Sequence, residues 1–244
     1  VGARRVHHLL APHLVEQADD AAGHRAHFEG VEGAFEPVPR GRDGRALRLT
    51  RGGGRAVSLP VRSPETTGLA GGEWCPYGTG GQGPEFPADQ REDDGKSLVF
   101  DSPPLAERLE ILGAPVATLS LQSDRPTAYV VARLCDVAPD GASALVCYGL
   151  LNLTHRDSHE FPQPLEPGRR YRVRVQLGDI AHAFPAGHRI RLALSTGYWP
   201  IAWPSPRRVL LALHTGKSAL RLPVRPPRAE DDRLPAFAPP ERPK

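Results

Sequence analysis

The stretch 183–200, AFPAGHRIRLALSTGYWP, decides the fold class. After the turn signal Pro-Ala-Gly, the next residues alternate strictly, with Ile190, Leu192 and Leu194 on one face and Arg191 on the other. Such alternation is typical of a β-strand that buries one of its two faces. We therefore expect this stretch to cross a sheet, with its aliphatic side chains in the core and Arg191 in solvent.

The bulky residues that follow this strand raise the question of a site. Gly197 permits a bend, and Tyr198, Trp199 and Trp203 then lie beyond the end of the alternating run. Aromatic side chains at the edge of a sandwich more often seal its core than bind a ligand. We expect these three to lie at a sheet edge.

Short strands and turns recur regularly between residues 97 and 224. Turn signals separate them, such as Gly-Ala-Pro at 113–115, Pro-Asp-Gly at 139–141 and Pro-Gly at 167–168. The run 144–155 is apolar on both faces, which predicts a central strand covered on each side. About eight strands with turns at regular spacing favour an all-β, antiparallel sandwich.

Composition agrees with this fold class and narrows the function. The 244 residues are 39% hydrophobic and include 25 Gly and 27 Pro, which suits short strands joined by turns rather than a helical bundle. A net charge of +3 is too small to indicate a nucleic-acid partner. Arg170, Arg172 and Arg174 alternate and are expected on the solvated face of one strand. Since no stretch approaches the ~20 apolar residues of a membrane helix, we expect no membrane partner.

The cysteines bear on the cellular compartment. Cys75, Cys135 and Cys147 form no C-x-x-C pair, and their number is odd. Free, buried thiols in a reducing compartment are the simplest interpretation. The apolar run at the N-terminus is too short for a signal peptide. We therefore predict a cytoplasmic location.

The chain is expected to divide into three parts. We expect residues 1–61 to form a poorly defined, irregular N-terminal extension with a short helix. Within it, the runs 45–50 and 56–61 are expected to form a hairpin or two edge strands. Residues 62–225 contain the sandwich, preceded by a long Gly/Pro loop of the kind that is usually functional or wrapped over a surface. Residues 226–244 form a Pro-rich tail with little to bury.

No catalytic or metal-binding motif stands out. A serine-hydrolase elbow has the pattern G-x-S-x-G between a strand and a helix, but Ser143 lies in a hairpin turn and Ser195 at a strand end. His155 and His159 flank Asp157 in THRDSH, where a turn is favoured over a metal site. We predict no catalytic residue, no metal and no cofactor.

Acidic residues gather in ADQREDDG, residues 88–95. Carboxylates at close spacing can bind calcium, which is the alternative interpretation of this run. Charge runs are more often solvated than functional. The sequence predicts a solvated acidic turn here.

Five stretches in this order resemble one family. They are DQREDDGKSLVFDSPPL (89–105), LCDVAPDGAS (134–143), YGLLNLTHRDS (148–158), LEPGRRYRVRVQL (165–177) and FPAGHRIRLALST (184–196). Together they are similar to the C-terminal domain of the CocE/NonD serine hydrolases, which include X-Pro dipeptidyl-peptidases, cocaine esterase and α-amino-acid ester hydrolases. The resemblance implies a jelly-roll β-sandwich, galactose-binding-like, packed against a preceding catalytic α/β-hydrolase domain.

The resemblance also bears on the site residues. In the family the nucleophile, the acid and the histidine belong to the α/β domain, and no position of this chain matches them. The loop GLAGGEWCPYG, residues 68–78, is implied to reach toward the active-site cleft. Trp74 and Tyr77 are therefore candidates for the substrate cleft or the domain interface, with Tyr198, Trp199 and Trp203 as the second choice.

The leading hypothesis is a non-catalytic C-terminal sandwich of a serine hydrolase that acts on esters or amides. Its partner would be a catalytic α/β-hydrolase domain, missing or on a separate chain, or a second copy of the sandwich. One alternative is a free-standing jelly-roll module that binds a carbohydrate-like ligand. Another is a small hydrolase with an unrecognised triad, against which the missing serine elbow counts.

Overall fold

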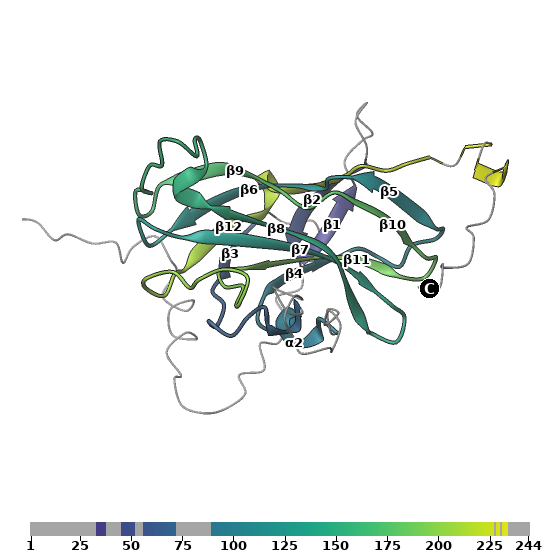
Figure 1. Cartoon of the computed structure of the whole chain (residues 1–244), viewed down its shortest axis with the longest axis horizontal. Coiled ribbons are helices and arrows are strands. Elements are labelled where there is room, and N and C mark those ends of the chain that lie inside the picture. Colours follow the sequence, from purple (N-terminus) through teal and green to yellow (C-terminus); the bar gives the residue numbers. More distant parts are fainter. Residues whose placement is uncertain are drawn as a thin grey trace, which may run out of the picture.

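The computed structural model of the chain describes residues 33–37 and 45–51 as backbone, and residues 56–71, 89–226, 228–229 and 231–233. Within these ranges the protein is almost entirely β-structure, folded into an elongated sandwich (Figure 1). The all-β sandwich expected from the sequence is confirmed. The jelly-roll strand order and the galactose-binding-like class stay predictions.

The strands are β1 (Gly33–Pro37), β2 (Arg45–Arg51), β3 (Ser58–Val61), β4 (Leu98–Asp101), β5 (Leu109–Gly113), β6 (Val116–Ser123), β7 (Tyr129–Val137), β8 (Ser143–Asn152), β9 (Arg170–Gln176), β10 (Ile180–Phe184), β11 (Arg189–Ser195), β12 (Leu211–His214) and β13 (Ala219–Leu222). The helical turns are η2 (Leu69–Gly71), α2 (Arg91–Asp94), η3 (Leu153–His155), η4 (Thr215–Lys217) and η5 (Asp231–Arg233). In the described part of the chain, no helix has the length and apolar character needed to span a membrane.

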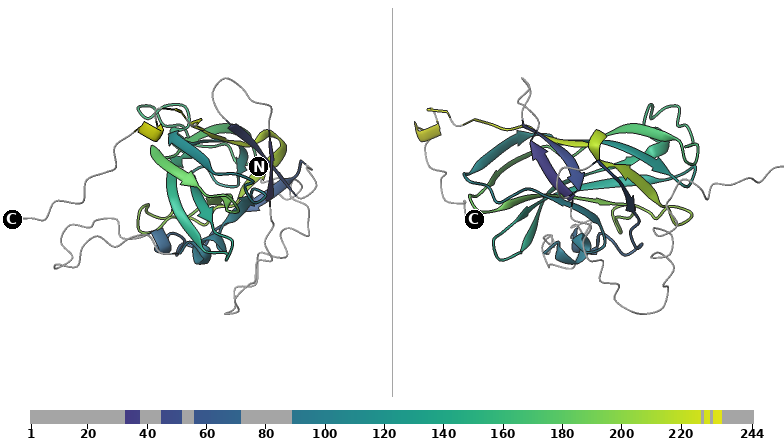
Figure 2. Two further views of the ribbon diagram at one scale, coloured as in Figure 1. Left: turned by 90° about the vertical axis from the view of Figure 1, so that its right-hand side faces the viewer. Right: turned by 180° about the vertical axis from the view of Figure 1, so that it is seen from behind.

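Eleven strands form one hydrogen-bonded sheet that folds over on itself. Its order is β3-β12-β6-β13-β2-β1-β4-β11-β7-β8, and β9 also pairs with β6. Strands β4, β11, β7 and β8 form one layer, and the strands around β6 face them across the core (Figure 2). The strands β5 and β10 form a separate two-stranded sheet.

The alternating strands place their side chains as the sequence predicts. Ile190, Leu192 and Leu194 of β11 are buried in the main core. Leu192 pairs with Phe100 of β4 and Leu134 of β7, both of which are also fully buried. On β9, the valines point inward while the three arginines at 170, 172 and 174 are exposed, as expected. These layers meet because each strand offers one continuous apolar face.

The prediction of a central strand over 144–155 is wrong. Strand β8 ends the strand order and exposes Tyr148 and Leu150. The strand that is buried along its whole length is its neighbour β7, although β7 contains Arg133 and Asp136. A strand with two ionisable residues can occupy the centre only if partners from elsewhere in the chain neutralise them, and those partners are not visible in the strand's own sequence.

The N-terminal runs also pair differently from the predicted hairpin. Strand β2 lies between β1 and β13, so only β3, which pairs with β12, is an edge strand. The predicted hairpin is therefore wrong: β2 pairs with β1 and β13, and β3 pairs with β12, but β2 and β3 do not pair with each other. The predicted short helix falls outside the described residues, as does most of the Pro-rich tail.

Candidate functional site

The outer face of the layer β4–β11–β7, which points away from the core, is covered by residues 63–71 and 89–97. We call these two stretches the covering segments. Figure 1 shows α2, part of the second stretch, on the far side of these strands from β6. Ser63 and Thr196 exchange two hydrogen bonds of 2.9 and 3.3 Å, and the Trp199 N–H donates to the Thr67 carbonyl at 2.7 Å. The first covering segment, residues 63–71, is thus attached to the chain beyond β11.

Asp94 lies at the centre of a buried ionic network beneath α2. Its carboxylate lies 3.1 Å from Arg133 Nη2 and accepts a 3.0 Å hydrogen bond from Arg191 Nη1. Ser143 Oγ donates to the same carboxylate at 2.7 Å. Arg133 has no exposed surface, and Asp94 is only 5% exposed. Because Asp94 and Arg133 are both buried, removal of either would leave the other as an unpaired charge inside the protein.

The network continues to Asp101 on β4. Arg191 Nε and Nη2 donate to its two carboxylate oxygens at 2.7 and 2.6 Å, a bidentate pair. Hydrogen bonding to Asp101 holds the pKa of the Arg191 guanidinium above its ordinary range. Arg191 is therefore not in solvent, and the expectation of a solvated outer face on β11 is wrong. The covering segments supply the reason, because they exclude water from this face.

A second group of bonds joins the two covering segments to each other. The Ala70 N–H donates to Asp93 Oδ2 at 2.9 Å, and the Ala70 carbonyl accepts from the Gln90 side-chain amide. Gln90 Oε1 in turn accepts from Arg133 Nη1 at 2.8 Å. Asp93 is fully buried. The prediction of a solvated acidic turn is therefore wrong for Asp93 and Asp94, which arginines of β7 and β11 and a backbone N–H hold inside the protein, whereas Asp89 and Glu92 are exposed as expected.

The structure brings together three aromatic residues that the sequence singled out. Tyr198 is buried against Tyr129 and Val131, and burial raises the pKa of its hydroxyl well above the usual range. The rings of Trp199 and Trp203 meet edge to face at 5.5 Å. Trp203 is 81% exposed. Tyr198 thus covers part of the outer face of β7, so the expected position at a sheet edge is wrong for this residue. Trp199 is half-buried, and only Trp203 of the pair is exposed.

Exposed Leu69 belongs to the same region. Its neighbour Gly68 has φ +112°, and a Cβ there would lie 2.6 Å from the Trp199 carbonyl oxygen, so only glycine fits this contact. We call Leu69, Trp199 and Trp203 the aromatic surface. Trp74 and Tyr77 lie outside the described residues.

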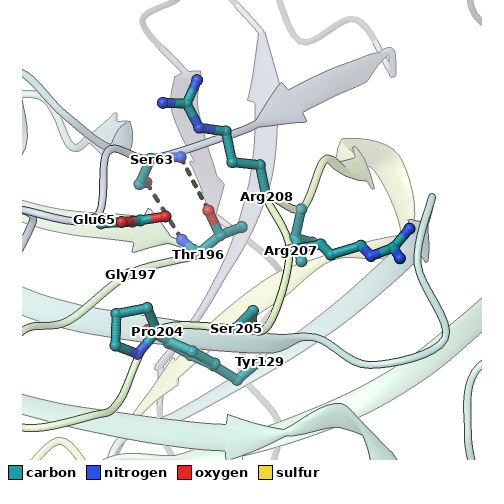
Figure 3. A pocket seen from close by; sticks show the side chains of 10 residues that line it. Ser63, Glu65, Tyr129, Thr196, Gly197, Pro204, Ser205, Arg207 and Arg208 are labelled. Atoms are coloured by element: carbon teal, nitrogen blue, oxygen red, sulfur yellow. Dashed lines mark hydrogen bonds between the residues drawn. The ribbon is translucent and has the colours of Figure 1, made fainter.

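A small hollow that opens to solvent lies next to the aromatic surface, at Pro204 (Figure 3). Figure 3 shows the hydrogen-bonded Ser63–Thr196 pair on one side of it and Tyr129 and Pro204 on the other. Glu65, Arg207 and Arg208 are the charged residues of its lining. The sequence did not indicate this hollow because its walls come from separate stretches of the chain. The lining residues are Ser63, Glu65, Tyr129, Thr196, Gly197, Pro204, Ser205, Arg207, Arg208 and Val209.

The two serines considered as nucleophiles are bonded within the fold. Ser143 Oγ donates to Asp94, and Ser195 Oγ donates to the Gly197 carbonyl at 2.8 Å. Both residues are buried. Neither hydroxyl is bonded to an imidazole, which is the group that would activate it.

Four histidines of the described residues contact other side chains of the fold. The rings of His155 and His159 lie 5.5 Å apart around η3 and the turn that follows it. His182 Nε2 and His188 Nδ1 lie 3.0 and 2.8 Å from the two carboxylate oxygens of Asp136, which joins β10 to β7. Across the described ranges, no three His, Cys, Asp or Glu side chains are arranged to hold a metal ion.

Comparison with known proteins identifies the family to which the chain belongs. The family model "X-Pro dipeptidyl-peptidase C-terminal non-catalytic domain" matches residues 22–230. Cocaine esterase of Rhodococcus sp. (strain MB1 Bresler) is 28% identical over 161 residues, which is 63% of this chain and 28% of the esterase.

Two solved structures share the fold. One is an α-amino acid ester hydrolase, with a TM-score of 0.58 and 21% identity over 72% of this chain and 34% of that chain. The other is an aminopeptidase from the marine sediment archaeon Thaumarchaeota archaeon, with a TM-score of 0.59 and 19% identity over 79% of this chain and 37% of that chain. This chain spans between 28% and 37% of the length of these relatives. It belongs to the family of X-Pro dipeptidyl-peptidase C-terminal non-catalytic domains.

Proposed function

We propose that this domain serves a CocE/NonD-type serine hydrolase that acts on esters or amides, and that its outer face packs against the catalytic α/β-hydrolase domain. The family match supports the non-catalytic role. The names of the similar proteins, two ester hydrolases and an aminopeptidase, support the substrate class. The single observation that carries the docking face is Trp203, a large apolar side chain left 81% exposed.

An exposed tryptophan packed on a half-buried one is typical of a surface that another protein covers. Tryptophan is among the residues that contribute most to binding when a partner buries it at the centre of an interface. Trp203 lies against Trp199 at 5.5 Å, and Leu69 beside them is 55% exposed. A partner that covers these three residues would remove the exposed apolar surface of Trp203 and Leu69 from water.

We propose that Trp74 and Tyr77 contribute to the same interface or to the substrate cleft. The described residues on either side of their segment, Gly71 and Asp89, both belong to the covering segments. Gln90, next to Asp89, bonds to Ala70, next to Gly71. The segment therefore leaves and rejoins the fold at one place, close to Tyr198, whose hydroxyl would lie 3.0 Å from a Cβ at Gly71.

We also propose a cytoplasmic location and a jelly-roll strand order. Cys135 and Cys147 are free and buried, which supports a reducing compartment. The sheet that folds over on itself, with most strands antiparallel, supports the jelly roll.

The partner for the test is a CocE/NonD-type α/β-hydrolase catalytic domain encoded in the same genome. Sedimentation velocity of that domain with this chain is expected to detect a complex. Trp203→Ala is expected to weaken it by about thirtyfold, the effect of losing an interface hot spot. Leu112→Ala, which removes an apolar residue exposed on β5, is the matched control and is expected to leave the affinity unchanged. A complex that Trp203→Ala leaves intact would contradict the docking face.

The alternative of a carbohydrate-binding module is tested with the same variants. Titration of simple sugars and oligosaccharides, followed by tryptophan fluorescence, is expected to give no saturable change. Saturable binding that Trp203→Ala abolishes would support the carbohydrate module in place of the docking face.

A further inference from the structure

Arg133 occupies an unusual place for an arginine. It lies in the middle of β7, the strand that is buried along its whole length, has no exposed surface, and bonds to residues on the outer face. A buried ion pair seldom stabilises a fold better than apolar side chains of the same size. The position therefore calls for a role that an apolar residue cannot fill.

That role begins at Gln90. Arg133 Nη1 donates to Gln90 Oε1 at 2.8 Å, and because a guanidinium has donors but no acceptor, it fixes which end of the amide faces it. The amide nitrogen of Gln90 then faces the Ala70 carbonyl and donates to it. The charge on β7 thus determines which hydrogen bond Gln90 makes to the first covering segment.

The contacts continue from Ala70 to the aromatic surface. Ala70 lies two residues after Gly68. The backbone of Gly68 lies so close to that of Trp199 that a Cβ at this position has no room. The Thr67 carbonyl accepts the 2.7 Å hydrogen bond from the Trp199 N–H. Trp199 in turn supports the ring of Trp203.

We infer that Arg133 is a positioning residue: through Gln90 it fixes residues 67–71, and through them it holds the Trp199–Trp203 pair in place before any partner binds. A surface fixed in advance loses less conformational entropy on binding, so its affinity is higher. This consequence rests on the proposed docking function, whereas the positioning itself is a property of the isolated chain.

The test is hydrogen–deuterium exchange on the isolated chain, with Gln90→Met as the main variant. This change removes the amide and leaves the ion pairs of Arg133 and Asp94 in place. Peptides over 63–71 and 196–203 are expected to exchange about tenfold faster or more, the range expected for loss of a buried hydrogen bond. Peptides over 170–176 in β9 are expected to keep their rate.

Two further variants make each result decisive. Arg133→Met with Asp94→Leu replaces the central pair by apolar side chains of similar size and is expected to accelerate the same peptides. Arg172→Met, an exposed arginine of β9, is expected to change none of them. Wild-type exchange at 196–203 in Gln90→Met, or faster exchange that extends equally to β9, would overturn the positioning role. Faster local exchange with unchanged affinity for the catalytic domain would support the positioning role and contradict its consequence for docking, while the docking face itself is tested by Trp203→Ala.

Discussion

Leu192→Ala is expected to lower the free energy of unfolding by about 3–5 kcal/mol. Leu192 has no exposed surface, and its cross-strand neighbours Phe100 and Leu134 have none either. Deletion of its three outer carbons loses their transfer free energy and leaves a cavity. Since sheet hydrogen bonds fix the backbone on both sides, the cavity cannot close by movement of the neighbouring strands, which places the effect in the upper part of the usual range of about 2–5 kcal/mol.

The matched control is Leu150→Ala on the edge strand β8. Leu150 is 38% exposed, so the same change is expected to cost about 1 kcal/mol or less. Equilibrium unfolding in urea, followed by tryptophan fluorescence and circular dichroism, measures both values, with equal m-values as evidence of unchanged two-state behaviour. If Leu150→Ala destabilised the protein as much as Leu192→Ala, the assignment of the inner face of β11 would be wrong.

Two further outcomes follow from the outer face. Arg191→Met is expected to lower the free energy of unfolding by about 2–3 kcal/mol, because it leaves Asp94 with fewer partners inside the protein, whereas Arg172→Met is expected to change it by about 0.5 kcal/mol or less; equal values in urea unfolding would contradict the buried ionic network. Burial raises the pKa of the Cys135 and Cys147 thiols to about 12, so both stay protonated at pH 8 and are expected to react with a thiol reagent such as DTNB only after unfolding. Fast labelling of either in the native state, located by mass spectrometry, would show that the thiol is accessible.

Much of the fold was predictable because it depends on local alternation. Ile190, Leu192 and Leu194 define the inner face of β11 by spacing alone, and the valines of β9 do the same. The pairing of β2 with β13 and of β3 with β12 was not predictable, since these partners lie far apart along the chain and no local turn joins them. The burial of β7 on both faces was missed because it depends on partners for Arg133 and Asp136 that lie outside the strand.

The candidate site likewise has a part that the sequence predicts and a part that it does not. The run from Tyr198 to Trp203 stands out in the sequence, since bulky aromatics directly after a strand are conspicuous, and the structure places them together. The buried ionic network does not stand out. Asp94 looks like part of a solvated acidic run until the fold places Arg133 and Arg191 beneath it, and that placement depends on tertiary structure.

The central claim is that this chain is a non-catalytic domain, and labelling with a serine-reactive fluorophosphonate tests it most directly. Intact-mass spectrometry of the purified chain after incubation is expected to show no adduct. Hydrolysis of p-nitrophenyl esters and X-Pro amides is expected to stay at background, because the hydroxyls of Ser143 and Ser195 are bonded to oxygen acceptors inside the fold. A stoichiometric adduct on one serine, accompanied by hydrolysis above background, would contradict the account.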